Sequence, residues 1–87
     1  MNAKETVARN MRRLRVARGL SQETFADEAG IDRTYVSRLE RNKENPTVAV
    51  LEKIARALNV EIAALFADPG PADEKPPSLP AGRKKKT

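Results

Sequence analysis

The 87-residue sequence contains no cysteine and no histidine. Without cysteine there is neither a disulfide framework nor a thiolate metal site, and without histidine the usual general base and the commonest zinc ligand are missing. The serines therefore have no imidazole to activate them, and the acidic residues are scattered without a metal-ligand spacing. The composition argues against an enzyme, a bound metal and a cofactor.

Long apolar runs are also missing. No stretch approaches the roughly 18 apolar residues that a membrane span needs, and residues 1–19 do not resemble a signal peptide. We therefore expect a cytoplasmic protein without a membrane partner. At 87 residues the chain has room for one small domain, and its core is near the lower limit for independent stability. A partner chain would add to that stability.

Positive charge is in excess. Lysine and arginine number 17 against 12 acidic residues, which gives a net charge of +5 and an isoelectric point of about 10.0. Residues 1–18 hold the acid Glu5 and six basic residues, namely Lys4, Arg9, Arg12, Arg13, Arg15 and Arg18. This balance favours a polyanionic partner, but a solvated helix face has the same composition.

Hydrophobic spacing predicts helices throughout. Val7, Met11 and Leu14 follow the i, i+4, i+7 pattern, which indicates an amphipathic helix over about residues 4–18. Gly19 follows it, and glycine commonly ends a helix because it adopts the left-handed conformation at little cost.

Three further helices are predicted from their N-cap residues, Ser21, Asp32 and Thr47. Apolar pairs around these caps have the spacing of hydrophobic staples: Leu20 with Phe25, Ile31 with Val36, and Pro46 with Leu51. A short fifth helix is expected at residues 61–66, although Glu61 is a poor cap that offers only its charge to the helix dipole. The pattern predicts a compact, all-α domain of five helices over residues 1–67.

The composition changes at Asp68, where DPGPADEKPPSLPAGRKKKT begins. This segment has five prolines and two glycines and cannot bury enough apolar surface to order itself. We expect residues 68–87 to form a flexible tail. Its RKKK end would either contact nucleic-acid backbone or serve only to keep the chain soluble.

The segment around Ala29, Gly30 and Ile31 predicts a helix-turn-helix, because two short helices meet there at a tight turn. On a helical wheel for residues 32–42, Tyr35, Val36 and Leu39 share one side. The other side carries Arg33, Thr34, Ser37, Arg38 and Arg41. This polar side suits the major groove of DNA, where hydroxyl residues allow close approach and arginine binds guanine O6 and N7.

The run GLSQETFADEAGIDRTYVSRLERNKENPTVAVLEKIARALNV resembles the DNA-binding domain of the phage-repressor and Cro family, also called the xenobiotic-response-element type. The resemblance covers residues 5–66 and rests on LSQ at the second helix, Ala26, the AGI turn, SRLERN, and NPT before the fourth helix. DRTYVSRLERN is most similar to the controller proteins of restriction–modification systems, which are small dimers that regulate their own operons. The proline-rich tail is not expected of that subfamily.

The resemblance implies roles for individual residues. Arg15 would pair with Glu40 and join the first helix to the end of the third. Asn42 stands where many relatives have glycine, but asparagine also tolerates the left-handed conformation. Tyr35 would either reach a phosphate through its hydroxyl or only fill the core. The expected base readers are Arg33, Thr34, Ser37 and Arg38, and the expected phosphate contacts are Gln22, Tyr35, Arg41, Asn42, Lys43 and Asn45.

One recognition helix touches too few base pairs to select a genomic site, so we expect a homodimer on a palindromic operator. Ile62, Leu65 and Phe66 are the predicted seam, with core packing as the alternative, chiefly for Ile62 or Leu65. The sequence thus predicts a DNA-binding transcription regulator whose partners are double-stranded DNA and a second copy, without an evident small-molecule ligand. The alternative is a protein-interaction module on the same fold, such as an antitoxin or a coactivator-like partner, with an exposed apolar patch and an uncharged third helix.

Overall fold

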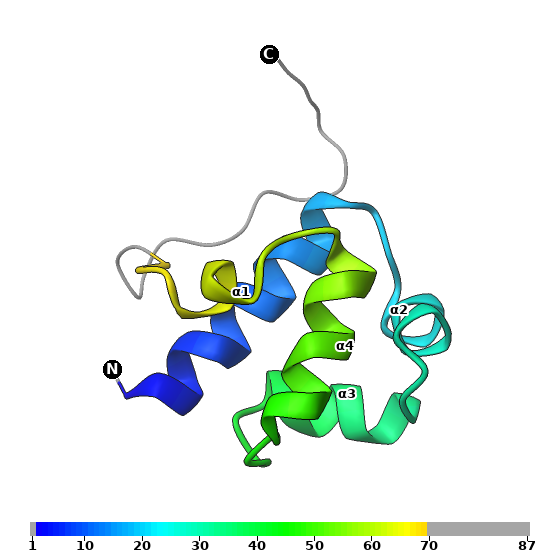
Figure 1. The fold of residues 1–87 in the computed structure, drawn as a ribbon. Coiled ribbons are helices and arrows are strands. Elements are labelled where there is room, and N and C mark those ends of the chain that lie inside the picture. The colour runs from blue at the N-terminus through cyan, green and yellow to red at the C-terminus, as the bar shows by residue number, and fades with distance from the viewer. Residues whose placement is uncertain (1, 70–87) are drawn as a thin grey trace.

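The chain folds into four α-helices, α1 (Ala3–Ala17), α2 (Gln22–Ala29), α3 (Arg33–Glu40) and α4 (Val48–Leu58), followed by a 3-10 helix, η1 (Ile62–Phe66) (Figure 1). This computed structural model describes residues 2–69, which contain no strand. The predicted all-α class is confirmed. Most of the predicted tail, residues 70–87, lies outside the described residues, so the boundary at residue 67 stays a prediction.

Side-chain caps begin all four α-helices. The predicted caps Ser21, Asp32 and Thr47 each accept a hydrogen bond from a backbone amide in the first turn of their helix. Asn2, which the sequence analysis did not identify, caps α1 and forms a capping box with Glu5. These bonds satisfy amides that have no partner within the helix and so fix where each helix starts.

The four α-helices also end in one common way. One or two residues after the end of each helix, a residue has a left-handed backbone conformation. The φ angles are 74° at Gly19, 73° at Gly30, 63° at Asn42 and 59° at Asn59. The next residue then donates its amide back to the last turn, which is the Schellman motif. These bonds run from Leu20 to Arg15, Ile31 to Ala26, Lys43 to Arg38 and Val60 to Ala55, at 2.9 to 3.2 Å.

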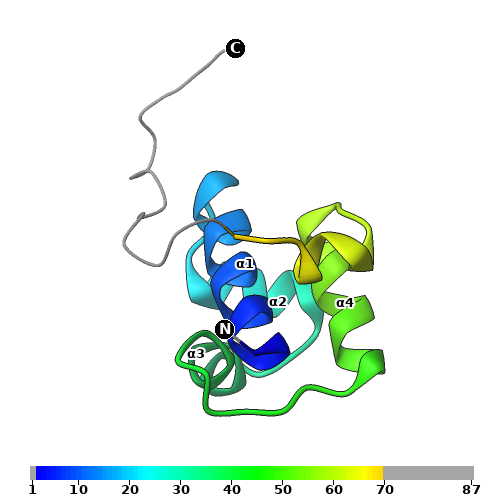
Figure 2. The same cartoon turned by 90° about the vertical axis from the view of Figure 1, so that its left-hand side faces the viewer.

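The core lies where all five helices meet, and α3 forms one end of the molecule. Met11, Phe25, Val36, Ile54 and Leu65 have no exposed surface and come from the five different helices. In both views α3 lies at the lower edge of the molecule, close to the segment that leads into α4 (Figures 1 and 2). The outer side of α3 is therefore free to meet a large partner.

The fifth predicted helix is present as the 3-10 helix η1 rather than as a fifth α-helix. It has five residues, and Glu61 before it makes no side-chain cap hydrogen bond. Short segments without a cap commonly adopt the tighter i to i+3 pattern. Among residues 2–69 no helix combines the length and apolar character of a membrane-spanning segment.

Candidate nucleic-acid interface

The turn between α2 and α3 positions α3. Ala26 and Ala29 are buried on α2, and small side chains there let the following chain pack closely. The amide of Ile31 donates to the carbonyl of Ala26 at 3.0 Å and closes the turn. No atom lies within 4 Å of a Cβ built at Gly30, so its left-handed φ of 73°, rather than space, is what favours glycine. These contacts fix the direction of α3.

The two sides of α3 differ as its sequence pattern predicted. Val36 and Leu39 are buried, with 0% and 3% of their surface exposed. The predicted base readers lie on the other side: Arg33, Thr34 and Arg38 are exposed, and Ser37 is partly exposed. This side offers hydrogen-bond donors and hydroxyl groups rather than apolar surface.

Arg38 is held by the segment that follows α3. Its Nε donates to Oε2 of Glu44 at 2.5 Å, and its Nη2 donates to the backbone carbonyl of Lys43 at 3.2 Å. The left-handed backbone at Asn42 turns the chain back toward α3 and makes these contacts reachable. Glu44 was given no role by the sequence pattern or by the family resemblance. The available signal for this ion pair was an acidic residue six positions after an arginine, just beyond a predicted helix end.

The predicted phosphate contacts at the end of α3 are on the surface. Arg41, Lys43 and Asn45 are exposed, and Asn42 is partly buried. The Nε of Arg41 is 3.3 Å from the carbonyl oxygen of Ser37, which leaves its other N–H groups available. The surface beside the predicted base readers therefore carries two more cations.

Arg15 and Glu40 form the ion pair that the family resemblance implied. Arg15 donates from Nε to Oε2 at 2.7 Å and from Nη2 to Oε1 at 3.0 Å, and only 12% and 4% of the two side chains are exposed. Arg15 also donates from Nη1 to the carbonyl of Leu20 at 2.7 Å. The pair joins α1 to the end of α3 and to the segment before α2, so its arginine is structural.

Gln22, predicted to contact phosphate, belongs to the same network. Its Nε2 donates to Oε1 of Glu40 at 3.0 Å, and the residue is partly buried. One amide proton is therefore committed within the protein, and the other one can donate to an external acceptor. Local sequence patterns do not predict this contact, because Gln22 and Glu40 lie 18 residues apart.

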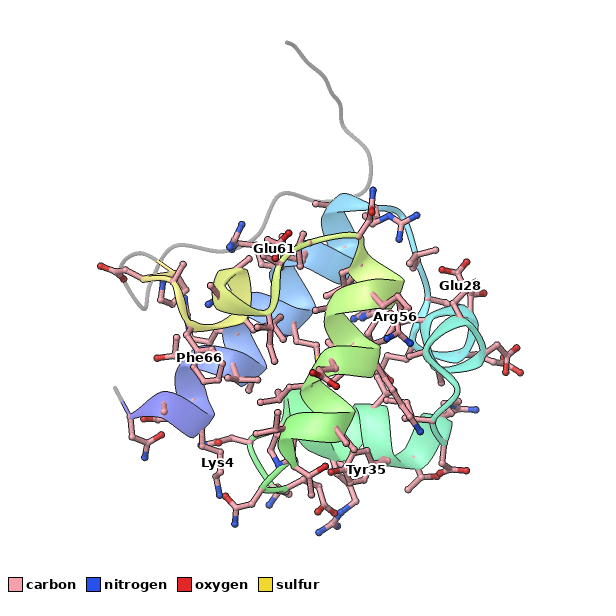
Figure 3. The ribbon with its side chains drawn as sticks, in the orientation of Figure 1. Lys4, Glu28, Tyr35, Arg56, Glu61 and Phe66 are labelled. Atoms are coloured by element: carbon pink, nitrogen blue, oxygen red, sulfur yellow. The ribbon has the colours of Figure 1, made fainter. Side chains whose placement is uncertain are left out.

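Tyr35 packs its ring against the core, and the residue as a whole is half-buried. Tyr35 belongs to α3 and lies at the lower edge of the molecule (Figure 3). Burial, followed by the nearby Glu44 carboxylate, raises the pKa of its phenol above the ordinary value. The hydroxyl therefore remains a hydrogen-bond donor at neutral pH. Both expected roles, core filling and phosphate contact, are compatible with this position.

The basic character of α1 is partly structural. Besides Arg15 in its ion pair, Arg13 donates to Oδ1 of Asn10 at 3.1 Å, and Arg18 donates to the backbone carbonyl of Ala57 at the end of α4. Arg13 thus bonds to a buried side chain of α1 itself, and Arg18 bonds to a backbone carbonyl of α4. Their charge alone therefore does not mark α1 as a nucleic-acid surface.

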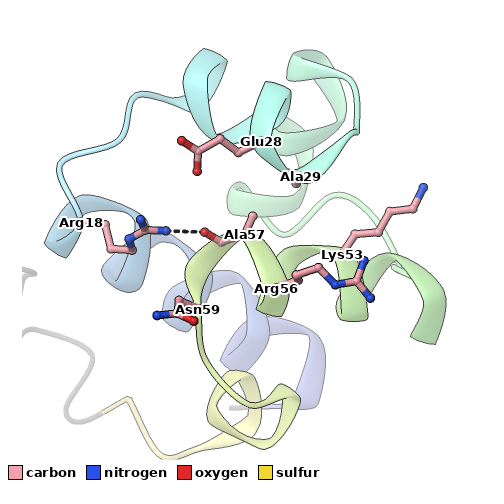
Figure 4. Close-up of a pocket in the computed structure, with 7 residues that line it drawn as sticks. All are labelled: Arg18, Glu28, Ala29, Lys53, Arg56, Ala57 and Asn59. Carbon is pink, nitrogen blue, oxygen red and sulfur yellow. Dashed lines mark hydrogen bonds between the residues drawn. The ribbon is translucent and has the colours of Figure 1, made fainter.

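A cleft of about 380 Å³ opens between the C-terminal ends of α1, α2 and α4 (Figure 4). Arg18 crosses it to reach Ala57, and the cleft is separate from the surface of α3. Among residues 2–69 no group of acidic side chains is arranged to hold a metal ion. The lining residues are Arg18, Glu28, Ala29, Lys53, Arg56, Ala57 and Asn59.

The three residues of the predicted dimer seam differ in exposure. Leu65 has no exposed surface within the protomer, which agrees with core packing, the alternative given for it. Ile62 is half-buried and packs against that core. Phe66 is 48% exposed, which is unusual for a large apolar side chain, and it lies beside α1 (Figure 3).

Known proteins are similar to this chain in sequence and in fold. Control protein C.SmaI of Serratia marcescens is 37% identical over 75 residues, which cover 86% of this chain and 89% of that protein. The crystal structure of hypothetical transcription factor NHTF from Neisseria matches with a TM-score of 0.76 and 43% identity, over 78% of each chain. The restriction–modification controller protein C.Esp1396I, solved as a tetramer with its natural 35 base-pair operator, matches with a TM-score of 0.70 and 33% identity, over 76% of this chain and 87% of that one.

A family model described as helix-turn-helix matches residues 11–65, which span α2, the turn and α3 together with the C-terminal part of α1, all of α4 and most of η1. The matched relatives are transcription regulators and controller proteins. The chain therefore belongs to the helix-turn-helix family of the xenobiotic-response-element type, which includes the controller proteins of restriction–modification systems.

Proposed function

We propose that this protein is a transcription regulator that binds a palindromic DNA site as a homodimer, with α3 in the major groove. The observation that carries the proposal is the outer side of α3, where Arg33, Thr34 and Arg38 are exposed together. The opposite side of the same helix is fixed in the core by Val36 and Leu39. A related controller protein was solved in complex with its operator, which supports DNA as the partner of this chain.

In this proposal the N-terminal end of α3 enters the major groove most deeply, where Arg33 and Thr34 contact base edges. Ser37 and Arg38 contact bases one helical turn further along. Arginine and short hydroxyl side chains are the groups that distinguish base pairs in the major groove. No catalysis or cofactor is required, and the DNA partner implies a cytoplasmic location.

Phosphate contacts would flank the base readers on both sides. Arg41, Asn42, Lys43 and Asn45 follow the C-terminal end of α3, where Gln22 bonds to Glu40, and Tyr35 lies in the first turn of the helix. Each phosphate neutralised would release counterions, so the logarithm of affinity should fall by about 0.9 per phosphate for each tenfold rise in salt.

The dimer seam would use Phe66 with the exposed part of Ile62. The protomer measures 33 by 28 by 21 Å. Two such protomers side by side can place their α3 helices about 34 to 36 Å apart, which is one turn of B-form DNA. A two-fold seam near η1 therefore fits successive major grooves on one face of the duplex.

The alternative, a protein-interaction module, would need a large exposed apolar patch together with an uncharged α3. Within residues 2–69 the large apolar side chains that are exposed are Val48 and Phe66, and neither belongs to α3. The outer side of α3 instead carries arginines and hydroxyl groups. This difference favours DNA over a protein partner at α3.

Selection from a random DNA pool, followed by sequencing, tests the proposal. We expect two inverted half-sites whose centres are about 10 to 10.5 base pairs apart. A variant with Arg33→Ala and Thr34→Ala serves as the control, because it retains the core side of α3 and should enrich no consensus. Equal retention of the selected duplex and a scrambled duplex by the unaltered protein would reject the proposal.

A further inference from the structure

We propose that Glu44 is a specificity-determining residue, which positions Arg38 for a guanine and withholds it from phosphates on other DNA. This inference rests on the proposed function. Glu44 would be a positioning residue, because it acts through the guanidinium of Arg38 rather than on a base. The sequence resemblance assigned it no role.

The two contacts fix the guanidinium of Arg38 while leaving donors free. Nε is bound by Glu44 at 2.5 Å and Nη2 by the carbonyl of Lys43 at 3.2 Å. A guanidinium is planar and rigid and carries five N–H groups, so these two bonds define its plane. Both N–H groups on Nη1 and the second one on Nη2 remain available. One N–H group of Nη1 and the remaining one of Nη2 would form the pair of donors that guanine O6 and N7 accept.

The backbone holds Glu44 in place for this contact. The amide of Lys43 donates to the carbonyl of Arg38 at 2.9 Å, while the side chain of Arg38 donates to the carbonyl of Lys43. Asn42, with φ of 63°, supplies the sharp turn between them. Because these reciprocal bonds tie the segment to the last turn of α3, Glu44 starts directly beside Arg38.

Stability alone does not account for the pair. The side chains of Arg38 and Glu44 are 45% and 28% exposed, and ion pairs at such exposed positions contribute little to folding. Their position on the outer side of α3 makes DNA binding the property they affect. On a guanine the guanidinium would already be oriented, so less side-chain freedom would be lost on binding.

The same pair should weaken binding to unrelated sequences. An unpaired Arg38 could swing to whichever phosphate is nearest and add one counterion-releasing contact. With Glu44 beside it, the local charge is neutral, and the carboxylate repels phosphate. The expected result is a larger ratio between affinity for the operator and affinity for random DNA, with little gain in affinity for the operator itself.

Glu44→Gln tests this inference in the full-length protein. Binding to a selected duplex and to a scrambled duplex is measured by fluorescence anisotropy over a series of salt concentrations. We expect the variant to bind scrambled DNA about three- to tenfold tighter, with a salt slope steeper by about 0.9, as one extra phosphate contact requires. Affinity for the selected duplex should change less than about twofold, so the discrimination ratio falls.

Glu61→Gln is the matched control, because Glu61 is exposed and lies on the opposite side of the molecule from α3 and Tyr35 (Figure 3). It removes the same charge and should leave the discrimination ratio unchanged. Thermal unfolding of both variants provides the check that folding is intact.

An Arg38→Ala background separates positioning from simple charge removal. If Glu44 acts through Arg38, Glu44→Gln in this background should shift both affinities equally and leave their ratio unchanged. The inference is overturned if the single Glu44→Gln variant keeps the wild-type ratio, or if the ratio falls equally in the Arg38→Ala background. Failure of the unaltered protein to distinguish the two duplexes would instead reject the proposed function.

Discussion

The side-chain amide of Asn10 donates a hydrogen bond to the backbone carbonyl of Leu65 at 2.9 Å, across 55 residues of sequence. The same nitrogen donates to the carbonyl of Ala67 at 2.7 Å, and the oxygen of Asn10 accepts from Arg13. Asn10 has no exposed surface. This buried polar side chain of α1, which bonds through both its nitrogen and its oxygen, thus holds η1 in position, and with it Phe66.

Asn10→Ala should destabilise the domain by about 2 to 4 kcal/mol, because two carbonyls beside the core lose their donor. Asn10→Asp should cost more, since a carboxylate would face those carbonyl oxygens. Urea unfolding followed by circular dichroism measures both changes. Asn45→Ala, at an exposed asparagine, is the control, and a loss at Asn10 no larger than at Asn45 would contradict this role for the amide.

Glu40→Gln should destabilise the domain by about 3 to 5 kcal/mol, because Arg15 would be left largely buried without its counter-charge. Replacing both partners, as in Arg15→Met with Glu40→Met, should cost less than the single change, since no uncompensated charge remains. Urea unfolding of the single and double variants tests this order. Equal or additive losses would show that the pair is not coupled.

The helices and their ends could be predicted because their causes are local. Ser21, Asp32 and Thr47 cap amides two or three residues away, and Gly19 and Gly30 end helices through their own backbone conformation. The two sides of α3 followed from helical spacing for the same reason. Nothing distant has to be known for such predictions.

The missed features depend on contacts between distant segments. In the sequence Asn10 is one more polar residue on α1, and its role follows only from the position of η1 beside it. Gln22 has the pattern of an exposed residue, and its bond to Glu40 follows only from the position of α3. Leu65 and Phe66 are adjacent apolar residues, and only the packing of η1 decides that Leu65 is buried and Phe66 exposed. The candidate site could be predicted as a surface, but the contacts that hold its side chains could not.

Phe66→Ala should weaken self-association about 10- to 100-fold, which corresponds to losing the burial of one large apolar side chain. Val48→Ala is the matched control, because Val48 is the other large apolar side chain exposed within residues 2–69 and it lies at the start of α4. Sedimentation equilibrium over a range of concentrations measures both. An unchanged dimer in Phe66→Ala, or equal weakening by both substitutions, would place the seam elsewhere.

Arg38→Ala should cost roughly 1 to 3 kcal/mol of binding on the selected duplex and little on scrambled DNA, because a base contact is lost. Arg41→Ala should instead weaken binding to both sequences alike and make the salt slope shallower by about 0.9, as expected for a phosphate contact. Anisotropy titrations at several salt concentrations separate the two patterns. Equal losses on both duplexes for Arg38→Ala would identify it as a backbone contact.

Tyr35 should titrate above its ordinary pKa of 10.0. The raised pKa comes first from burial and second from the Glu44 carboxylate, so Glu44→Gln should lower it in part while burial keeps it above 10.0. Because Tyr35 is the only tyrosine and there is no tryptophan, the near-ultraviolet absorbance of phenolate reports this one residue.

The stability consequence of this shift has a definite sign. A pKa that is higher in the folded than in the unfolded state contributes stability that is fully present below the unfolded value and is lost as pH rises through the folded one. Above about pH 10 the unaltered protein should therefore lose stability faster than Tyr35→Phe, which cannot ionise. Urea unfolding at stepped alkaline pH measures the difference. Parallel losses in the two proteins, or a Tyr35 titration at or below 10.0, would contradict the raised pKa.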